Sequence, residues 1–155
     1  MGNITFCTFD SKYAEDFKEI NLEWVKKYFV IEPHDIEQLN NPQEYIIDGG
    51  GEILFALDGE KVVGTCALIK TGDDEYELAK MGVSPLAQGK QIGYRLGMYT
   101  LETARTLGAK RIWLESNRKL TPALSLYTKL GFKEVPVTET PYVRADIRME
   151  LWMGN

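Results

Sequence analysis

The segment from Tyr76 to Leu107 constrains the fold more than any other part of the sequence. Residues 76–83 have the composition of a strand, residues 84–93 form a short loop with two glycines, and a helix then runs to about Leu107, where Gly108 ends it. The first amides of a helix have no internal partner and carry a positive partial charge, so such a loop can bind a phosphate. The alternative is an ordinary tight turn with a solvated Lys90. The spacing matches neither the Walker phosphate loop nor the dinucleotide fingerprint.

The other expected elements surround this unit. Strands are predicted at residues 3–10, 52–57, 61–69, 76–83, 111–115, 132–137 and 146–152. Helices are predicted after Asp10 or Ser11, from Pro33 to about Asn40, before Gly108, and from Thr121 to Gly131. Residues 45–47 fit either a strand or a short helix. An antiparallel meander with one crossover through the long helix predicts an α+β fold with a mostly antiparallel, centrally parallel sheet. No linker or repeat divides the chain, so residues 1–155 are expected to form one domain.

Composition narrows the possible partners. The chain has 155 residues, with 18 Lys and Arg against 23 Asp and Glu, a formal net charge of −5. This acidic balance argues against broad nucleic-acid binding, which needs a basic face. No apolar run reaches the roughly 20 residues that span a membrane, and the first residues lack a signal-peptide pattern. The two cysteines, Cys7 and Cys66, have no metal-binding or redox spacing and are expected in the core. A cytoplasmic protein without a metal is therefore expected.

The loop carries a specific resemblance. Residues 83–93 read Val-Ser-Pro-Leu-Ala-Gln-Gly-Lys-Gln-Ile-Gly and resemble the acetyl-CoA signature of the GNAT superfamily of N-acetyltransferases. That signature is Gln or Arg, two residues, Gly, one residue, then Gly or Ala. Gln88 and Gly93 match it, whereas Gln91 stands at the middle glycine. The resemblance covers nearly the whole chain and implies the family's mixed sheet with helices on both faces.

The resemblance also implies which residues bind coenzyme A. In the family, amides of this loop hold the pyrophosphate, and the end of the preceding strand pairs with the pantetheine arm in the manner of an added strand. On this sequence the corresponding residues are Met81, Val83, Gln88, Gly89, Lys90, Gln91, Ile92, Gly93 and Tyr94.

A second hallmark of the family lies further along the chain. Residues 126–132 read Leu-Tyr-Thr-Lys-Leu-Gly-Phe, which places Tyr127 at the position that lies beside the thioester sulfur in the family. Asn117 is a further cofactor-binding candidate, although the loop after it is three residues longer than the common form. Arg118 and Lys119 are candidates for contacting the adenosine 3′-phosphate.

The expected chemistry assigns two catalytic residues. Attack by an amine expels a thiolate, which a phenol with an ordinary pKa of about 10 can protonate, so Tyr127 is the candidate acid. An alkyl ammonium with a pKa of about 10.4 must lose a proton before it attacks, which calls for a base. Glu77, six residues before Val83, matches the position of the base in some family members. The alternatives are that Tyr127 only packs in the core or on the cofactor and that Glu77 is a solvated strand residue.

The acceptor site is expected between the first two helices and the last strands, as in the family. The candidates there are Glu32, Tyr142 and Arg144, with His34 and Asp35 nearby. Glu32 and Asp35 could pair with a cationic amine or cap a helix, and Arg144 could hold a carboxylate or form a strand-edge salt bridge. His34 reads as a surface residue. The aromatic residues Trp24, Tyr28 and Phe29 fit the core better than a binding platform.

These observations predict an N-acetyltransferase that moves an acetyl group from acetyl-CoA to a primary amine by direct transfer. A compact chain favours a small-molecule acceptor over a protein amine, and a homodimer is expected from the family. The alternatives are a non-catalytic acyl-CoA-binding module or sensor, and an acylating subunit of a larger assembly.

Overall fold

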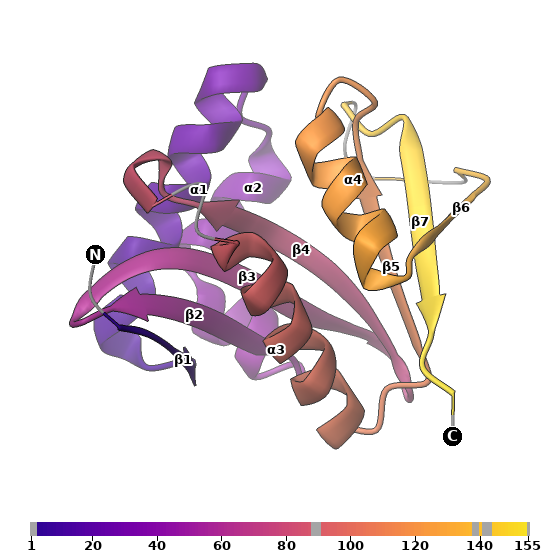
Figure 1. Cartoon of the computed structure of the whole chain (residues 1–155), viewed down its shortest axis with the longest axis horizontal. Coiled ribbons are helices and arrows are strands. Elements are labelled where there is room, and N and C mark those ends of the chain that lie inside the picture. The colour runs from indigo at the N-terminus through magenta and orange to yellow at the C-terminus, as the bar shows by residue number, and fades with distance from the viewer. Residues whose placement is uncertain (1–2, 88–90, 138–139, 141–143, 155) are drawn as a thin grey trace.

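The strands form one twisted sheet, and the helices pack against it (Figure 1). The computed structural model describes residues 3–87, 91–137, 140 and 144–154. The strands are β1 (Ile4–Thr8), β2 (Glu52–Asp58), β3 (Lys61–Gly72), β4 (Glu75–Val83), β5 (Arg111–Ser116), β6 (Lys133–Val135) and β7 (Ile147–Trp152). The helices are α1 (Ala14–Tyr28), α2 (Pro33–Asn40), α3 (Ile92–Thr106) and α4 (Thr121–Leu130). Single helical turns lie at Ser11–Tyr13, Gln43–Ile47 and Pro85–Ala87.

The sheet has seven strands in the order β1-β2-β3-β4-β5-β7-β6. Its pairs are antiparallel except the central pair of β4 and β5, which α3 connects as a crossover. This confirms the predicted mostly antiparallel, centrally parallel sheet. The predicted strand boundaries were too wide at residues 3–10 and 132–137. The ambiguous segment at residues 45–47 lies in the π-helical turn Gln43–Ile47.

Local signals explain where the helices begin and end. The Asp10 side chain accepts a hydrogen bond from the Lys12 amide at 3.0 Å and starts the turn that leads into α1. Pro33 lies in the first turn of α2, where its missing N–H is not needed. Gly131 ends α4 with a φ of 107°, a conformation that glycine adopts readily.

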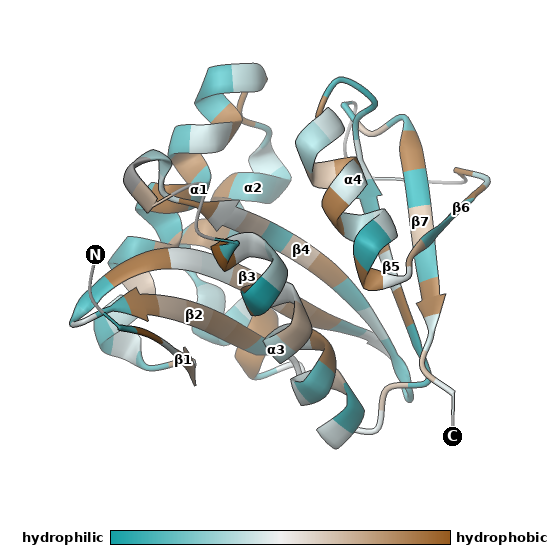
Figure 2. Cartoon of the chain, in the orientation of Figure 1, coloured by the Kyte–Doolittle hydropathy of each residue, from teal (hydrophilic) through white to brown (hydrophobic). Residues whose placement is uncertain are grey.

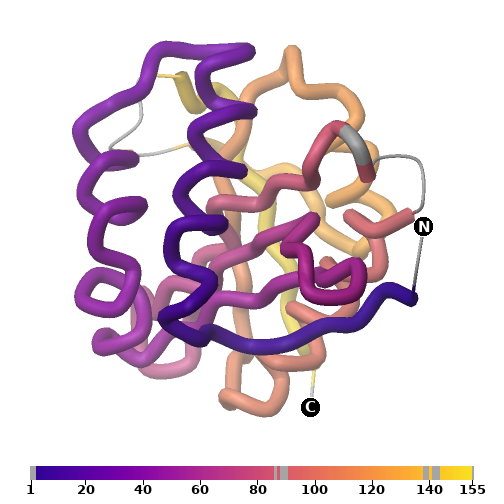
Figure 3. The backbone as a smooth tube through the Cα atoms, turned by 90° about the vertical axis from the view of Figure 1, so that its left-hand side faces the viewer, coloured from indigo at the N-terminus to yellow at the C-terminus, as the bar shows by residue number. Residues whose placement is uncertain are grey.

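Helices cover both faces of the sheet, and each face has its own core. Helices α1 and α2 lie over one face (Figure 3), and α3 and α4 over the other. Strand β2 shows the division, because Leu54 and Ala56 join the α3 side while Ile53 and Phe55 join the α1 side. Figure 2 shows the resulting apolar colouring of the central strands. The sheet thus separates two layers of helices.

Candidate active site

A fork between β4 and β5 forms the centre of the candidate site. The two strands pair only from Glu75 to Glu77, which lies opposite Trp113, and they separate beyond this point. A cavity of about 230 Å³ lies at the fork. Its wall is built from β4, β5, α4, the end of α1 and the segment before β7. Within the described residues, no other strand pairs with the edge of β4 that faces the fork.

A bulge at Lys80 accounts for the departure of β4. Ala79 pairs with Ala67 and Gly82 with Thr65, so two residues of β4 oppose one residue of β3. Lys80 has a φ of 52°, which is uncommon for a residue with a side chain. Because a bulge bends its strand and increases the local twist, it turns β4 away from β5.

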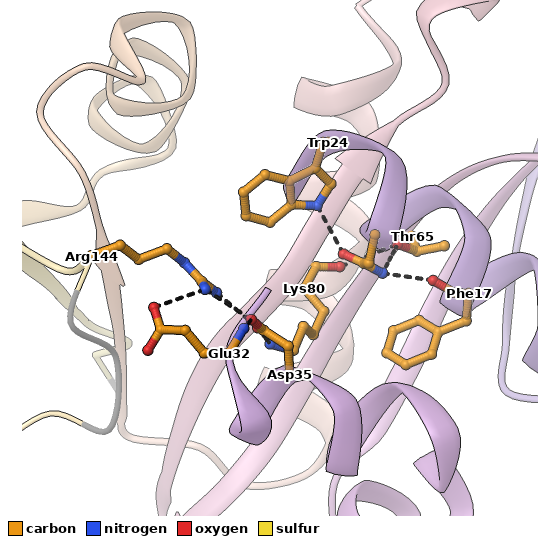
Figure 4. A network of polar contacts seen from close by, with 8 residues as sticks. Phe17, Trp24, Glu32, Asp35, Thr65, Lys80 and Arg144 are labelled. Atoms are coloured by element: carbon orange, nitrogen blue, oxygen red, sulfur yellow. Dashed lines mark hydrogen bonds and ion pairs between the residues drawn. The ribbon is translucent and has the colours of Figure 1, made fainter. Parts of the chain in front are cut away.

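Buried polar side chains hold the bulge in place (Figure 4). The Thr65 hydroxyl donates to the Lys80 carbonyl at 3.1 Å, and it accepts a hydrogen bond from the Asn21 amide of α1 at 3.2 Å. The indole of Trp24 donates to the Asn21 side-chain oxygen at 2.9 Å. Helix α1 therefore positions both the bulge and an aromatic wall of the cavity.

The Lys80 side chain enters a buried ion-pair network (Figure 4). Its ammonium lies 2.7 Å from the Asp35 carboxylate of α2, and the Arg144 guanidinium contacts both oxygens of Asp35 at 2.8 Å. Arg144 also contacts Glu32 at 3.2 Å. Burial alone would raise the pKa of Asp35, but hydrogen bonds and charges from Arg144 and Lys80 lower it well below its usual range. The network ties α2 and the segment before β7 to β4.

Glu77 lies at the base of the fork and lines the cavity. Tyr76 and Leu78 belong to the core on the α3 side, so Glu77 faces the α1 side of the sheet. Burial, then the negative charge of Glu115, raises its pKa to about 7, while Lys80 and Arg148 act in the opposite direction. A carboxyl group with this pKa can accept and release a proton near neutral pH.

Tyr127 of α4 lines the same cavity from the other side of the sheet. It is 9% exposed and belongs to the core on the α3 side, where its ring packs edge-on against Phe132. Burial, followed by the nearby Cys66 thiol, raises the pKa of Tyr127, so the hydroxyl keeps its proton. The cavity therefore reaches both faces of the sheet through the fork, with Glu77 on one and Tyr127 on the other.

Apart from Asn117, the predicted cofactor residues divide into four groups. Met81 and Val83, at the end of β4, line the cavity. Gln91 precedes α3 in the left-handed conformation, with φ 56° and ψ 24°, at the position where the signature has glycine. Ile92, Gly93 and Tyr94 form the first turn of α3, which presents amides without intrahelical partners. Gln88, Gly89 and Lys90 lie outside the described residues.

Asn117 lines the cavity, and its side chain organises the loop after β5. Its amide donates to the Arg144 carbonyl at 2.7 Å, and its oxygen accepts from the Lys119 amide at 3.0 Å. Arg118 forms an ion pair with Glu134. The Lys119 ammonium lies 4.6 Å from the centre of the Phe29 ring.

The acceptor candidates are brought together only in part. Glu32 and Arg144 share the buried network, and Arg144 also lines the cavity. His34 lies beside the network on α2 and is not among the cavity-lining residues; partial burial, then the Lys80 charge, lowers its pKa. Tyr142 lies outside the described residues.

The sequence interpretation missed several residues of the cavity wall. Trp24, Tyr28 and Phe29 line the cavity, whereas their helical spacing had favoured the core. Lys80 and Glu115 were not predicted at all. Helical spacing shows that a face is covered but not whether a core or a cavity covers it, and no sequence signal marks a bulge at a lysine.

The part of the chain that the structure describes holds neither a grouped metal-ligand set nor a membrane-spanning helix. No three His, Cys, Asp or Glu side chains there are grouped so that they could hold a metal ion. No helix in those ranges has the length and apolar character needed to cross a membrane.

Comparison with known proteins defines the class to which this fold and cavity belong. The model of the acetyltransferase (GNAT) family matches residues 17–132. Over 135 residues the chain is 33% identical to the uncharacterized N-acetyltransferase YjgM of Escherichia coli K12, covering 84% of this chain and 79% of that protein. The chain belongs to the GNAT family of acetyltransferases.

Solved structures agree with this fold. A GNAT-family acetyltransferase from Staphylococcus aureus Mu50 has a TM-score of 0.88 at 22% identity, covering 98% of this chain and 100% of that chain. YncA of Salmonella typhimurium, solved with its cofactor acetyl-CoA, has a TM-score of 0.75 at 18% identity, covering 97% of this chain and 94% of that chain.

Proposed function

We propose that this chain is an acetyl-CoA-dependent N-acetyltransferase that acetylates a primary amine of a small molecule by direct transfer in a ternary complex. The observation that carries the proposal is the cavity at the fork, which Glu77 lines from one face of the sheet and Tyr127 from the other. Two reactants can meet in such a cavity while each is held by a different layer of the protein.

The residues around the fork fit coenzyme A. Beyond Glu77, no other strand among the described residues pairs with the edge of β4 that faces the cavity, so this edge can pair with an extended amide-bearing arm. The first amides of α3, at Ile92 to Tyr94, suit a pyrophosphate. When bound, acetyl-CoA supplies a thioester carbon for the amine to attack and a sulfur leaving group.

Glu77 is proposed as the general base. An incoming ammonium must give up a proton before its nitrogen can attack, and a carboxylate with a pKa of about 7 holds that proton well enough to take it. The same carboxylate, on the α1 face, also favours binding of the cationic form of the acceptor. The proton then leaves Glu77 to solvent.

Tyr127 is proposed as the proton donor to the leaving sulfur. Its raised pKa keeps the hydroxyl protonated throughout the neutral range. The hydroxyl can donate a hydrogen bond to the developing thiolate and pass its proton to the sulfur as the carbon–sulfur bond breaks. The nitrogen loses its second proton to solvent as the amide forms, and Tyr127 recovers a proton from solvent. No covalent intermediate with the protein is needed, which agrees with the burial of Cys66 in the core.

The test is thiol release from acetyl-CoA in the presence of a panel of primary amines. We expect Glu77→Gln and Tyr127→Phe to lower kcat about 100-fold or more with the best amine, as is typical for loss of an acid or base. Tyr99→Phe is the matched control, since Tyr99 packs on Phe6 away from the cavity. Acetyl-CoA binding without thiol release for any amine would instead favour a non-catalytic acyl-CoA-binding module.

Three broader features belong to the same proposal. Residues 1–155 act as one domain, the protein works in the cytoplasm, and it forms a homodimer. Both cysteines are free thiols, as is usual in a reducing compartment. Light scattering at micromolar concentration tests the homodimer, with a monomer mass of 17.6 kDa as the contrary result.

A further inference from the structure

A second carboxylate lies beside the proposed base. The last pair of the β4–β5 ladder joins Glu77 and Trp113, and Glu115 lies two residues further along β5. Alternation along a strand places Glu115 on the same face as Trp113, so both carboxylates face the α1 side. Both also line the cavity.

The contacts of Glu115 fix the position of its carboxylate. Arg148 of β7 donates to Oε2 of Glu115 at 2.8 Å, and the Thr140 hydroxyl donates to Oε1 at 2.6 Å. The Glu115 side chain is only 2% exposed. The Arg148 guanidinium in turn lies 4.8 Å from the centre of the Trp113 ring. Both oxygens of Glu115 are therefore engaged, and one of them forms a buried ion pair.

Glu77 has the opposite environment. Within the ranges that the structure describes, no hydrogen bond or ion pair engages its carboxylate. One carboxylate of the pair is thus held by an arginine and a hydroxyl, while the other is left open to the cavity. Two neighbouring carboxyl groups with different surroundings commonly take different roles in acid–base catalysis.

We infer that Glu115 is a positioning residue of the proposed acetyl transfer. Its carboxylate, held by Arg148 and Thr140, places a negative charge beside Glu77, and this charge favours the transfer of a proton from the acceptor to Glu77. The inference rests on the proposed function, because it assigns a role to Glu115 only if Glu77 is the base. Glu115 itself exchanges no proton with the acceptor in this scheme.

The other charges around Glu77 determine how strongly Glu115 changes its pKa. Lys80 on β4 and Arg148 on β7 lower its pKa, whereas burial and Glu115 on β5 raise it. Lys80 is paired with Asp35 of α2, which also binds Arg144 of the cavity wall. Tyr127 of α4 approaches the cavity from the other face. Glu115 is the negatively charged neighbour in this set whose removal should favour the ionised form of Glu77 most.

The test is the pH dependence of kcat/KM for the best amine. The acidic limb of the wild-type profile should lie near pH 7 and disappear in Glu77→Gln. In Glu115→Gln the limb should move to lower pH by about half a unit or more, because a like charge has been removed. Glu115→Asp keeps the charge and should keep the limb within a few tenths of a pH unit of its wild-type position.

Two controls separate this role from a structural one. Glu150→Gln makes the same chemical change on β7, on the face that also carries Arg148. Glu150 is paired with Arg111 at 2.7 Å, and this variant should leave the acidic limb at its wild-type pH. If Glu115→Gln fails to fold, the charge-balanced double variant Glu115→Gln/Arg148→Met serves instead. It should also move the limb to lower pH, but by less, because a cation is lost as well.

The outcomes are distinguishable. An inactive wild-type protein, or a limb that survives in Glu77→Gln, overturns the proposed function. The role of Glu115 alone is overturned if the wild-type limb depends on Glu77 but does not move to lower pH in Glu115→Gln or in the double variant.

Discussion

Glu77→Gln should stabilise the folded protein in neutral and alkaline solution, even as it removes activity. The folded-state pKa of Glu77 is raised from an ordinary value of 4.5 to about 7, chiefly by burial. A carboxyl group whose pKa is raised on folding contributes fully to the stability of the folded protein below its unfolded-state pKa. This contribution is lost as the pH rises through its folded-state pKa. The loss therefore falls between about pH 4.5 and pH 7.

The size of the effect follows from the shift. A difference of roughly 2.5 pKa units, at about 1.4 kcal/mol each, gives an upper value of about 3 kcal/mol. Glutamine has a similar shape and does not ionise. The stability of Glu77→Gln relative to wild type should therefore increase by up to about 3 kcal/mol between pH 4.5 and pH 8.

Urea denaturation at several pH values measures this difference, and it needs neither cofactor nor acceptor. Glu150→Gln is the control, because hydrogen bonding to Arg111 lowers the pKa of Glu150 and moves its titration below this range. Its stability relative to wild type should stay nearly constant above pH 5. A difference for Glu77→Gln that is equally constant would refute the conclusion that Glu77 is a desolvated carboxyl group.

Three further predictions concern the scaffold of the site. Asp35→Ala should destabilise the protein by about 3–5 kcal/mol because it leaves a buried Lys80 without its partner, and Asp35→Leu/Lys80→Met should recover much of this loss in urea denaturation. Gln91→Gly should raise the stability by about 0.5–1 kcal/mol, measured as a higher Tm, because glycine adopts the left-handed conformation at φ 56° more readily. Gly51→Ala should destabilise by about 2 kcal/mol or more, because its Cβ would lie 2.1 Å from a backbone carbonyl oxygen of β3. Gly49→Ala, whose Cβ would meet its nearest neighbour at 3.8 Å, should be much less affected in the same denaturation assay.

Local patterns in the sequence predicted most of the fold. Alternation and turn residues located the strands, and the proline of α2 and the glycine after α4 marked helix ends. Glu77 and Tyr127 were predicted from a resemblance, and in the structure both line one cavity, from opposite faces of the sheet. That shared cavity depends on the fork between β4 and β5, which follows from a bulge at a lysine that no local pattern marks.

The buried network was beyond sequence reasoning for a different reason. Lys80 and Asp35 are 45 residues apart, and Arg144 and Asp35 are 109 apart. Asp35 and Arg144 were predicted near each other as residues of the acceptor site, with a salt bridge as the alternative for Arg144, whereas no pattern singled out Lys80. Only the packing of α2 and of the segment before β7 against β4 brings them together and removes them from water.

Calorimetric titration with acetyl-CoA tests the central claim most directly, with ATP as the control for phosphate binding alone. We predict micromolar binding that coenzyme A reproduces, because the free edge of β4 and the start of α3 bind the pantetheine arm and the pyrophosphate rather than the acetyl group. ATP, which lacks the arm, should bind far more weakly. Absence of binding to both acetyl-CoA and coenzyme A would contradict the account and leave the fork without a ligand.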